Sequence, residues 1–111
     1  MNNLQNDRSF MGCYYLHSNG SMIWKNKNVF INTTIEEYFD SPGLVIKYWP
    51  ITAKNPDTTK KEIDTMLEEA KDLGADESST TRIRTEFMKQ YEKAKGTTEA
   101  SSHVVLGKLA L

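Results

Sequence analysis

Three side chains in this sequence could bind a metal ion or support catalysis, namely Cys13, His17 and His103. A zinc site needs three or four clustered ligands, and only Cys13 and His17 lie close together in the chain. Nucleophilic catalysis needs a nucleophile next to a base, but Ser41 stands in a Ser-Pro-Gly sequence typical of a helix end. We therefore predict no metal site, no cofactor and no catalytic residues.

Acid–base catalysis and phosphate binding have no support in the sequence either. The carboxylate pairs Glu36-Glu37 and Glu68-Glu69 are adjacent residues of predicted helices, so their side chains point in different directions. The six glycines are scattered along the chain, without the spacing of a phosphate-binding loop. The sequence thus predicts a protein that is not an enzyme.

Recognition of nucleic acid is the second chemistry that the residues suggest. Aromatic and basic side chains alternate on predicted strands and turns, and such a sheet face can stack bases and bind phosphates. The residues concerned are Trp24, Lys25, Lys27, Lys47 and Trp49. The alternative interpretation, that the aromatic residues are core and face the helices, stays open at this point.

Charge is distributed unevenly, although the net charge of the chain is only -1. Residues 59–77 hold seven acidic and three basic residues, whereas residues 82–95 hold five basic and two acidic ones. Two neighbouring helices with complementary faces would explain this pattern. The other interpretation is a docking surface for an acidic protein partner, formed by Arg82, Arg84, Lys89 and Lys93.

The elements that must position these residues predict an α+β fold. We expect a small antiparallel sheet of three to four strands packed against two or three helices. The predicted strands are residues 13–17, 21–25, 29–31 and 44–51. The predicted helices are residues 34–40, 59–73 and 80–95, of which the last two pair on one face of the sheet.

The strand predictions depend on turn chemistry and on β-branched and aromatic residues. Asn19-Gly20 favours a type I′ hairpin turn, which needs positive φ at both central residues. Residues 44–51 are apolar on both faces, as expected of a central strand that is covered on both sides. Pro50 must end this strand or lie at an edge, because its nitrogen cannot donate a hydrogen bond.

The helix predictions depend on capping signals and on apolar periodicity. Thr34 and Glu37 have the spacing of a capping box, as do Thr59 and Glu62. Gly74 is placed to end the helix predicted at residues 59–73. An apolar stripe with helical spacing runs along that helix, through Ile63, Met66, Leu67, Ala70 and Leu73.

The predicted domain organisation is a disordered leader at residues 1–10, a single domain at 11–96, and a polar linker with an apolar C-terminal segment at 97–111. Residues 104–111 could return to their own sheet, pack on a partner, or form a homo-oligomer. The single cysteine excludes an intramolecular disulfide, and no apolar run is long enough to span a membrane. A cytoplasmic protein is expected.

Three sequence segments combine an aromatic strand, an Asn-Gly turn, a strand ending in Tyr-Trp and a helix closing in Leu-Gly-Ala: YYLHSNGSMIWK, EYFDSPGLVIKYW and LEEAKDLGA. In these features residues 13–76 resemble small uncharacterised proteins encoded by bacteriophages and prophages. The resemblance carries over no activity and no site residues. It implies a small protein made in a bacterial host cytoplasm, where many such proteins bind and alter host machinery.

The leading functional hypothesis from the sequence is a small non-enzymatic protein-binding accessory protein. In the setting that the resemblance implies, it would modulate or inhibit a host protein or a defence system. The alternative is a nucleic-acid-binding module that uses the aromatic and lysine-rich sheet residues.

Overall fold

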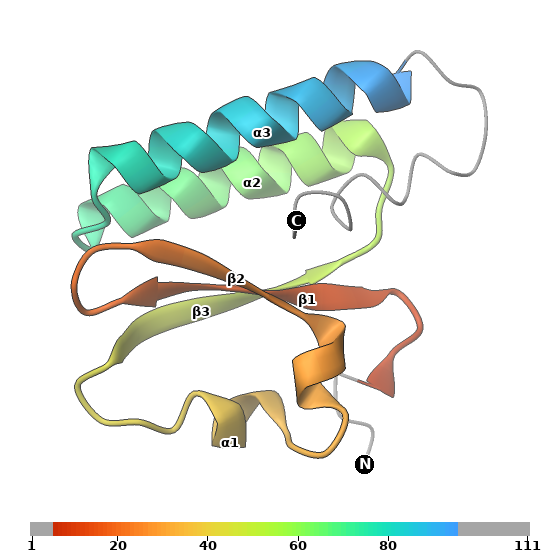
Figure 1. Ribbon diagram of the computed structural model, residues 1–111. Coiled ribbons are helices and arrows are strands. Elements are labelled where there is room, and N and C mark those ends of the chain that lie inside the picture. Colours follow the sequence, from red (N-terminus) through yellow and green to blue (C-terminus); the bar gives the residue numbers. More distant parts are fainter. Residues whose placement is uncertain (1–5, 96–111) are drawn as a thin grey trace.

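The computed structural model describes residues 6–95 and shows a small α+β fold (Figure 1). The two long helices lie side by side above the sheet, and the short helical segments lie below it. The elements in chain order are β1 (Phe10–His17), β2 (Met22–Asn26), the 3-10 helix η2 (Lys27–Phe30), α1 (Ile35–Tyr38), β3 (Val45–Thr52), α2 (Pro56–Asp72) and α3 (Glu77–Lys95).

The sheet has three antiparallel strands in the order β2-β1-β3, so β1 is central. Tyr14 lies opposite Trp24 of β2 and Trp49 of β3. Successive side chains of a strand point to opposite sides of the sheet. We call the side covered by α2 and α3 the helix side, and the side covered by η2 and α1 the α1 side.

The larger core fills the space between the helix side of the sheet and the two long helices. The apolar stripes of α2 and α3 pack here against Tyr14 and Leu16 of β1. Its buried members are Tyr14, Leu16, Met22, Ile51, Ile63, Met66, Leu67, Ala70, Ile83, Phe87 and Ala94. The predicted pairing of the long helices on one sheet face is therefore confirmed.

A second, smaller core lies on the α1 side and is mostly aromatic. Its buried members are Phe10, Cys13, Phe30, Ile35 and Phe39. The ring of Phe39 stacks on Tyr48 with centroids 5.0 Å apart. Offset and edge-to-face aromatic pairs add to the stabilisation that burial provides, so a layer of only two short helical segments can hold its shape.

Two strand predictions are wrong in detail. Residues 29–31 form no strand, because Val29 and Phe30 belong to η2, which Asn26 caps by accepting a hydrogen bond from the N–H of Asn28. The strand predicted at 44–51 is β3, which lies at an edge and not at the centre. An edge position accommodates Pro50, which cannot serve as a donor in a central strand.

The hairpin turn differs from the predicted type I′ turn. Among residues 6–95 only glycines have positive φ, so Asn19 does not adopt the left-handed conformation. The N–H of Gly20 donates to the carbonyl of His17 at 2.9 Å, and Gly20 itself has φ +95°. The hairpin therefore closes through a tight turn centred on Ser18 and Asn19, followed by a left-handed glycine.

Helix α2 begins earlier than predicted and ends where predicted. Asn55 is the N-cap, since its side chain accepts from the N–H of Thr58 at 2.9 Å, and Pro56 occupies the first turn. Thr59, the predicted cap, is instead a buried residue inside the helix. Gly74 has φ +110° and follows the last turn, while Leu73 from the predicted stripe is 42% exposed.

The other helix ends are set by short polar side chains. Thr34 caps α1 as predicted, accepting from the N–H of Glu37 at 3.1 Å. At the start of α3, Asp76 accepts from the N–H of Ser79 at 2.7 Å. This backbone hydrogen bond, together with one from the Ser78 hydroxyl, lowers the pKa of the Asp76 carboxyl.

Regular structure begins inside the segment 1–10, which the sequence predicts to be a disordered leader. β1 begins at Phe10, which is buried in the second core. The carbonyl of Ser9 accepts from the N–H of Ala53, so residue 9 also contacts the sheet region. The predicted linker and apolar segment at 97–111 lie outside the described residues.

Among the glycines of residues 6–95, Gly12 is the one at which an added side chain would meet the closest contacts. It has φ +152°, and a Cβ there would lie 2.6 Å from the Trp24 ring and 2.4 Å from the carbonyl oxygen of Lys25. Gly12 also sits at a register irregularity between β1 and β3. The absence of a side chain therefore lets the Trp24 ring lie against the central strand.

We predict that Gly12→Ala lowers the free energy of unfolding by about 2–3 kcal/mol, because backbone strain and a steric clash add together. Urea denaturation measures this change. Gly43→Ala is the matched control, since Gly43 has φ +82° but a Cβ added there would meet no atom within 4 Å. That control should cost about 1 kcal/mol. Equal losses in both variants would contradict the role given to the Trp24 contact.

Candidate binding surfaces

The two tryptophans proposed for nucleic-acid binding lie on the helix side of the sheet. Both are directly opposite Tyr14 in the strand register, and the Tyr14 and Trp24 rings have centroids 4.7 Å apart. Trp24 and Trp49 are partly buried against the larger core. The helices therefore cover the sheet face on which these rings would have to stack bases.

The three lysines of the same set do not all lie on that side of the sheet. Lys25 lies opposite Cys13, which belongs to the α1-side core, and Lys27 begins η2. Lys47 lies opposite Leu16, on the helix side, together with Trp49. The structure thus brings Lys47 and Trp49 together and separates them from Lys25 and Lys27.

The carboxylate of Glu69 on α2 holds both Lys47 and Trp49. The indole N–H of Trp49 donates to Glu69 Oε1 at 2.6 Å, and Lys47 Nζ lies 2.8 Å from Glu69 Oε2. The same ammonium lies 5.5 Å from the centre of the Trp49 ring. The hydrogen bond from Lys47, followed by that from Trp49, lowers the pKa of Glu69. These residues join α2 to the edge strand.

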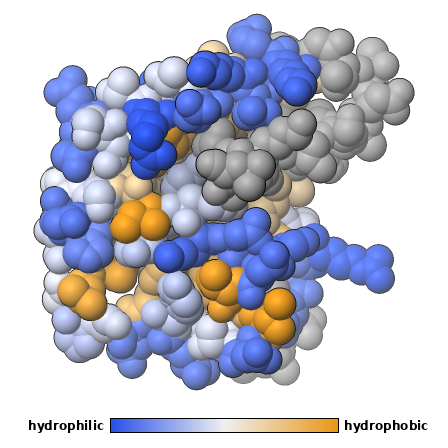
Figure 2. Space-filling model, viewed as in Figure 1, coloured by the Kyte–Doolittle hydropathy of each residue, from blue (hydrophilic) through white to orange (hydrophobic). Residues whose placement is uncertain are grey.

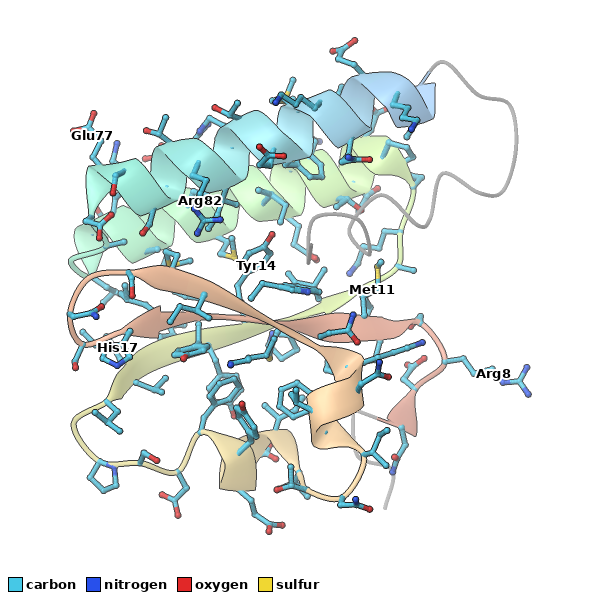
Figure 3. The ribbon with its side chains drawn as sticks, in the orientation of Figure 1. Arg8, Met11, Tyr14, His17, Glu77 and Arg82 are labelled. Atoms are coloured by element: carbon cyan, nitrogen blue, oxygen red, sulfur yellow. The ribbon has the colours of Figure 1, made fainter. Side chains whose placement is uncertain are left out.

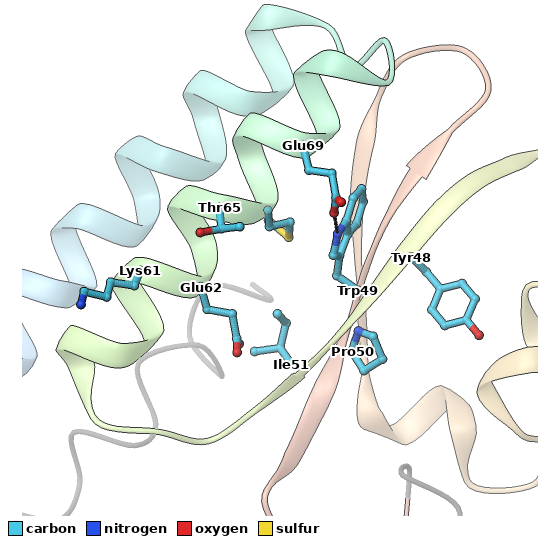
Figure 4. A pocket seen from close by; sticks show the side chains of 9 residues that line it. Tyr48, Trp49, Pro50, Ile51, Lys61, Glu62, Thr65 and Glu69 are labelled. Atoms are coloured by element: carbon cyan, nitrogen blue, oxygen red, sulfur yellow. Dashed lines mark hydrogen bonds between the residues drawn. The ribbon is translucent and has the colours of Figure 1, made fainter.

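A groove of about 440 Å³ runs beside this contact, between β3 and α2 (Figure 4). Its floor includes the core residues Ile51 and Met66. Its rim carries Glu62, whose Oε2 lies 2.9 Å from Lys54 Nζ. The groove has an apolar floor and a mixed rim, and its polar residues form no catalytic arrangement that the described contacts reveal.

The basic residues proposed as a partner surface have different roles in the fold. Arg82 reaches from α3 toward the sheet (Figure 3), where its guanidinium donates to the carbonyl of Met22 at 3.2 Å. Arg84 pairs with Asp64 of α2 at 3.3 Å. Lys89 lies 3.8 Å from Glu86 on the same helix, and Lys93 is exposed. Arg82 and Arg84 therefore hold α3 in place.

The part of the chain that the structure describes contains no group of three His, Cys, Asp or Glu side chains that could hold a metal ion. Cys13 is fully buried in the α1-side core. Burial, reinforced by the nearby Glu36 carboxylate, raises the pKa of the Cys13 thiol to about 12. His17 lies at the end of β1, and its Nδ1 accepts from the N–H of Asn19 at 3.0 Å. His103 lies outside the described residues.

Within residues 6–95, three buried side-chain nitrogen or oxygen atoms have no hydrogen-bond partner: Tyr14 Oη, Trp24 Nε1 and Glu62 Oε1. Burial raises the pKa of Tyr14, against a smaller opposing effect of the Arg82 guanidinium. Each of these unpaired groups costs free energy relative to its hydrated state.

No helix among the described residues is long and apolar enough to cross a bilayer.

An apolar surface on the α1 side is not evident from the sequence predictions. Six large hydrophobic side chains of residues 6–95 are exposed, and five of them come from residues 29–46. We call these five the apolar surface: Val29, Ile31, Tyr38, Leu44 and Ile46. Hydrophobic side chains are visible in the lower half of Figure 2, the half that η2 and α1 occupy in Figure 1.

The sequence does not predict the apolar surface, because several of its residues fall within predicted strands and are therefore expected to be buried in the sheet. Ile31 ends a predicted strand, but it follows η2 and is 73% exposed. Ile46 lies in the predicted central strand, but it falls at a register irregularity between Lys47 and Val45 and is 49% exposed. A signal is present nonetheless, because residues 28–46 contain many apolar residues and no lysine or arginine.

A small hollow opens into this surface between α1 and the start of β3. Its volume is about 230 Å³. Aromatic and aliphatic side chains form most of its lining, which consists of Tyr15, His17, Tyr38, Phe39, Ser41, Leu44 and Val45. A hollow of this size is smaller than a typical small-molecule site and has room for a group about as large as one side chain.

Comparison with known protein families, with curated proteins and with solved structures gives no match for this chain.

We predict that Trp24→Ala lowers the free energy of unfolding by about 3 kcal/mol, since it removes a ring packed on Tyr14 and Gly12. Urea denaturation of the variant measures the loss. Val29→Ala is the control, because Val29 is 39% exposed and its truncation should change stability by less than about 0.5 kcal/mol. A folded, equally stable Trp24→Ala protein would instead show that the indole is dispensable for packing.

We also predict that Cys13 is inert in the native protein. Burial excludes reagents, and its raised pKa leaves almost no reactive thiolate at neutral pH. A chromogenic disulfide reagent added at neutral pH should react only as fast as the protein opens, and immediately once the protein is unfolded in concentrated urea. Rapid reaction of the native protein, at the rate of a small-molecule thiol, would contradict the burial of Cys13.

Proposed function

We propose that this chain is a small non-enzymatic protein-binding protein that docks on its partner through the apolar surface. The observation that carries the proposal is the concentration of exposed hydrophobic side chains in residues 29–46. Single exposed hydrophobic residues are ordinary, but a group of them on one layer is typical of an interaction site.

The layer beneath the apolar surface is built to hold it in place. Tyr38 packs edge-on against Phe30 and Phe39, with ring centroids 5.1 Å apart in both pairs. Thr34 caps the short helix that carries Tyr38. Preorganised side chains lose less entropy on binding than mobile ones, which favours docking without a large rearrangement.

The resemblance to small phage and prophage proteins supplies the proposed setting. There the partner is a protein of the bacterial host cytoplasm, and binding modulates or inhibits a host enzyme or a defence system. The nucleic-acid alternative draws less support from the geometry, because Trp24 and Trp49 pack under the helices and Lys25 and Lys27 lie apart from them.

The proposal is tested by a pull-down with tagged protein from bacterial lysate, with and without nuclease. The double variant Ile31→Asp with Leu44→Asp should lose the captured protein, because each new carboxylate would be desolvated in the interface. Leu73→Asp should retain it, since Leu73 is similarly exposed but lies at the end of α2, outside the apolar surface.

Thermal unfolding of both variants checks that they remain folded. Retention of the same partner by the Ile31 and Leu44 double variant would remove the apolar surface from the proposal. A captured species that disappears after nuclease treatment would favour the nucleic-acid alternative.

A further inference from the structure

The hollow between α1 and β3 is aromatic on several sides. Phe39 contacts two other rings of its lining, with ring centroids 5.0 Å from Tyr15 and 5.1 Å from Tyr38. Both tyrosines and Phe39 line the hollow. Aromatic rings carry negative charge density on their faces, so a hollow made of them attracts cations as well as apolar groups.

The chain segment that supplies most of the hollow carries charges of one sign. Residues 28–46, which supply most of its lining and the whole of α1, contain three acidic residues and no lysine or arginine. Glu36 and Glu37 lie on α1, and Asp40 lies between the lining residues Phe39 and Ser41 in the sequence. Glu36 and Asp40 are exposed and take part in no ion pair among the described residues.

The nearest cations in the sequence do not neutralise these carboxylates. Lys47 is held by Glu69 on the helix side of the sheet. Lys25 and Lys27 belong to β2 and η2, and neither forms an ion pair with Glu36 or Asp40 among the described residues. Glu36 also acts on Tyr48, because its charge adds to the burial that raises the pKa of that tyrosine. The Tyr48 ring stacks on Phe39, and Phe39 lines the hollow.

We propose that the hollow binds one basic side chain, an arginine or a lysine, which the partner protein presents within an apolar segment. This inference rests on the proposed function and specifies its partner. The long aliphatic part of such a side chain would contact Leu44 and Val45. Its cationic end would lie against the tyrosine rings, with Glu36 and Asp40 as counter-charges.

The inference differs from the docking surface predicted from the sequence. That surface is basic and calls for an acidic partner, but Arg82 and Arg84 are engaged within the fold. The acidic residues of α2 form a less suitable surface for a basic and apolar partner, because Leu73 is the one exposed large apolar residue of that region. The α1 side combines exposed apolar area, a hollow and unpaired carboxylates in one place.

The test uses two synthetic peptides, acetyl-Ala-Leu-Arg-Leu-Ala-amide and its counterpart with glutamate in place of arginine. Each is titrated to millimolar concentration into isotope-labelled protein, and amide shifts are followed by NMR. The arginine peptide should shift the amides of residues 38–41, 43–45 and Tyr15, and raised salt should weaken the effect. The glutamate peptide should leave these amides unshifted.

Two variants and one matched control locate the interaction. Tyr38→Leu keeps an apolar side chain but removes the aromatic face, and should weaken binding about twofold to fivefold. Glu36→Gln with Asp40→Asn should weaken it by a similar factor. Glu68→Gln with Asp72→Asn removes two exposed carboxylates of α2 instead and should leave the affinity unchanged.

Equal shifts with both peptides would overturn the inference that the hollow selects a basic side chain. That result would leave the apolar docking surface as proposed. Shifts confined to α2, or none with either peptide, would overturn the inference. The pull-down with the Ile31 and Leu44 variant then decides the proposed function separately. An unchanged affinity in both hollow variants would also reject the hollow as the binding site.

Discussion

The central strand β1 must be buried on both sides, and the rest of the structure depends on that constraint. Tyr14 and Leu16 point into the larger core, while Cys13 and Phe10 point into the smaller one. A strand with apolar residues on both faces is stable only when both faces are covered. The long helices cover one face, and η2 with α1 covers the other.

The two covering layers differ in thickness and in how much apolar side chain they leave exposed. The helix layer is held by apolar stripes, by the Glu69 contacts to the edge strand and by Arg82. The α1 layer is thinner and leaves hydrophobic side chains exposed between its short segments. The helix layer thus buries the larger core, and the α1 layer leaves five large hydrophobic side chains exposed.

The turns between strands and helices connect these layers. The carbonyl of Gly20 in the hairpin turn accepts from the N–H of Asp76 at 2.7 Å, so the turn is fixed to the start of α3. The N–H of Ser18 donates to the carbonyl of Leu44 at 2.8 Å, beside the hollow. His17, which lines the hollow, precedes this turn. The position of α3 and the shape of the hollow consequently depend on the same short turn.

Local signals in the sequence determined the helices, the hairpin and the α+β class. Thr34 as a cap, Gly74 as a stop and the apolar spacing of Ile63, Met66, Leu67 and Ala70 act over a few residues, so they can be recognised without the fold. Strand order was decided only in the tertiary structure, because pairing joins residues that are distant in the chain. Placing β3 at an edge exposed Ile46, and folding residues 27–30 as η2 exposed Ile31. Whether an apolar residue is core or surface depends on what covers it, and that is a property of the whole fold.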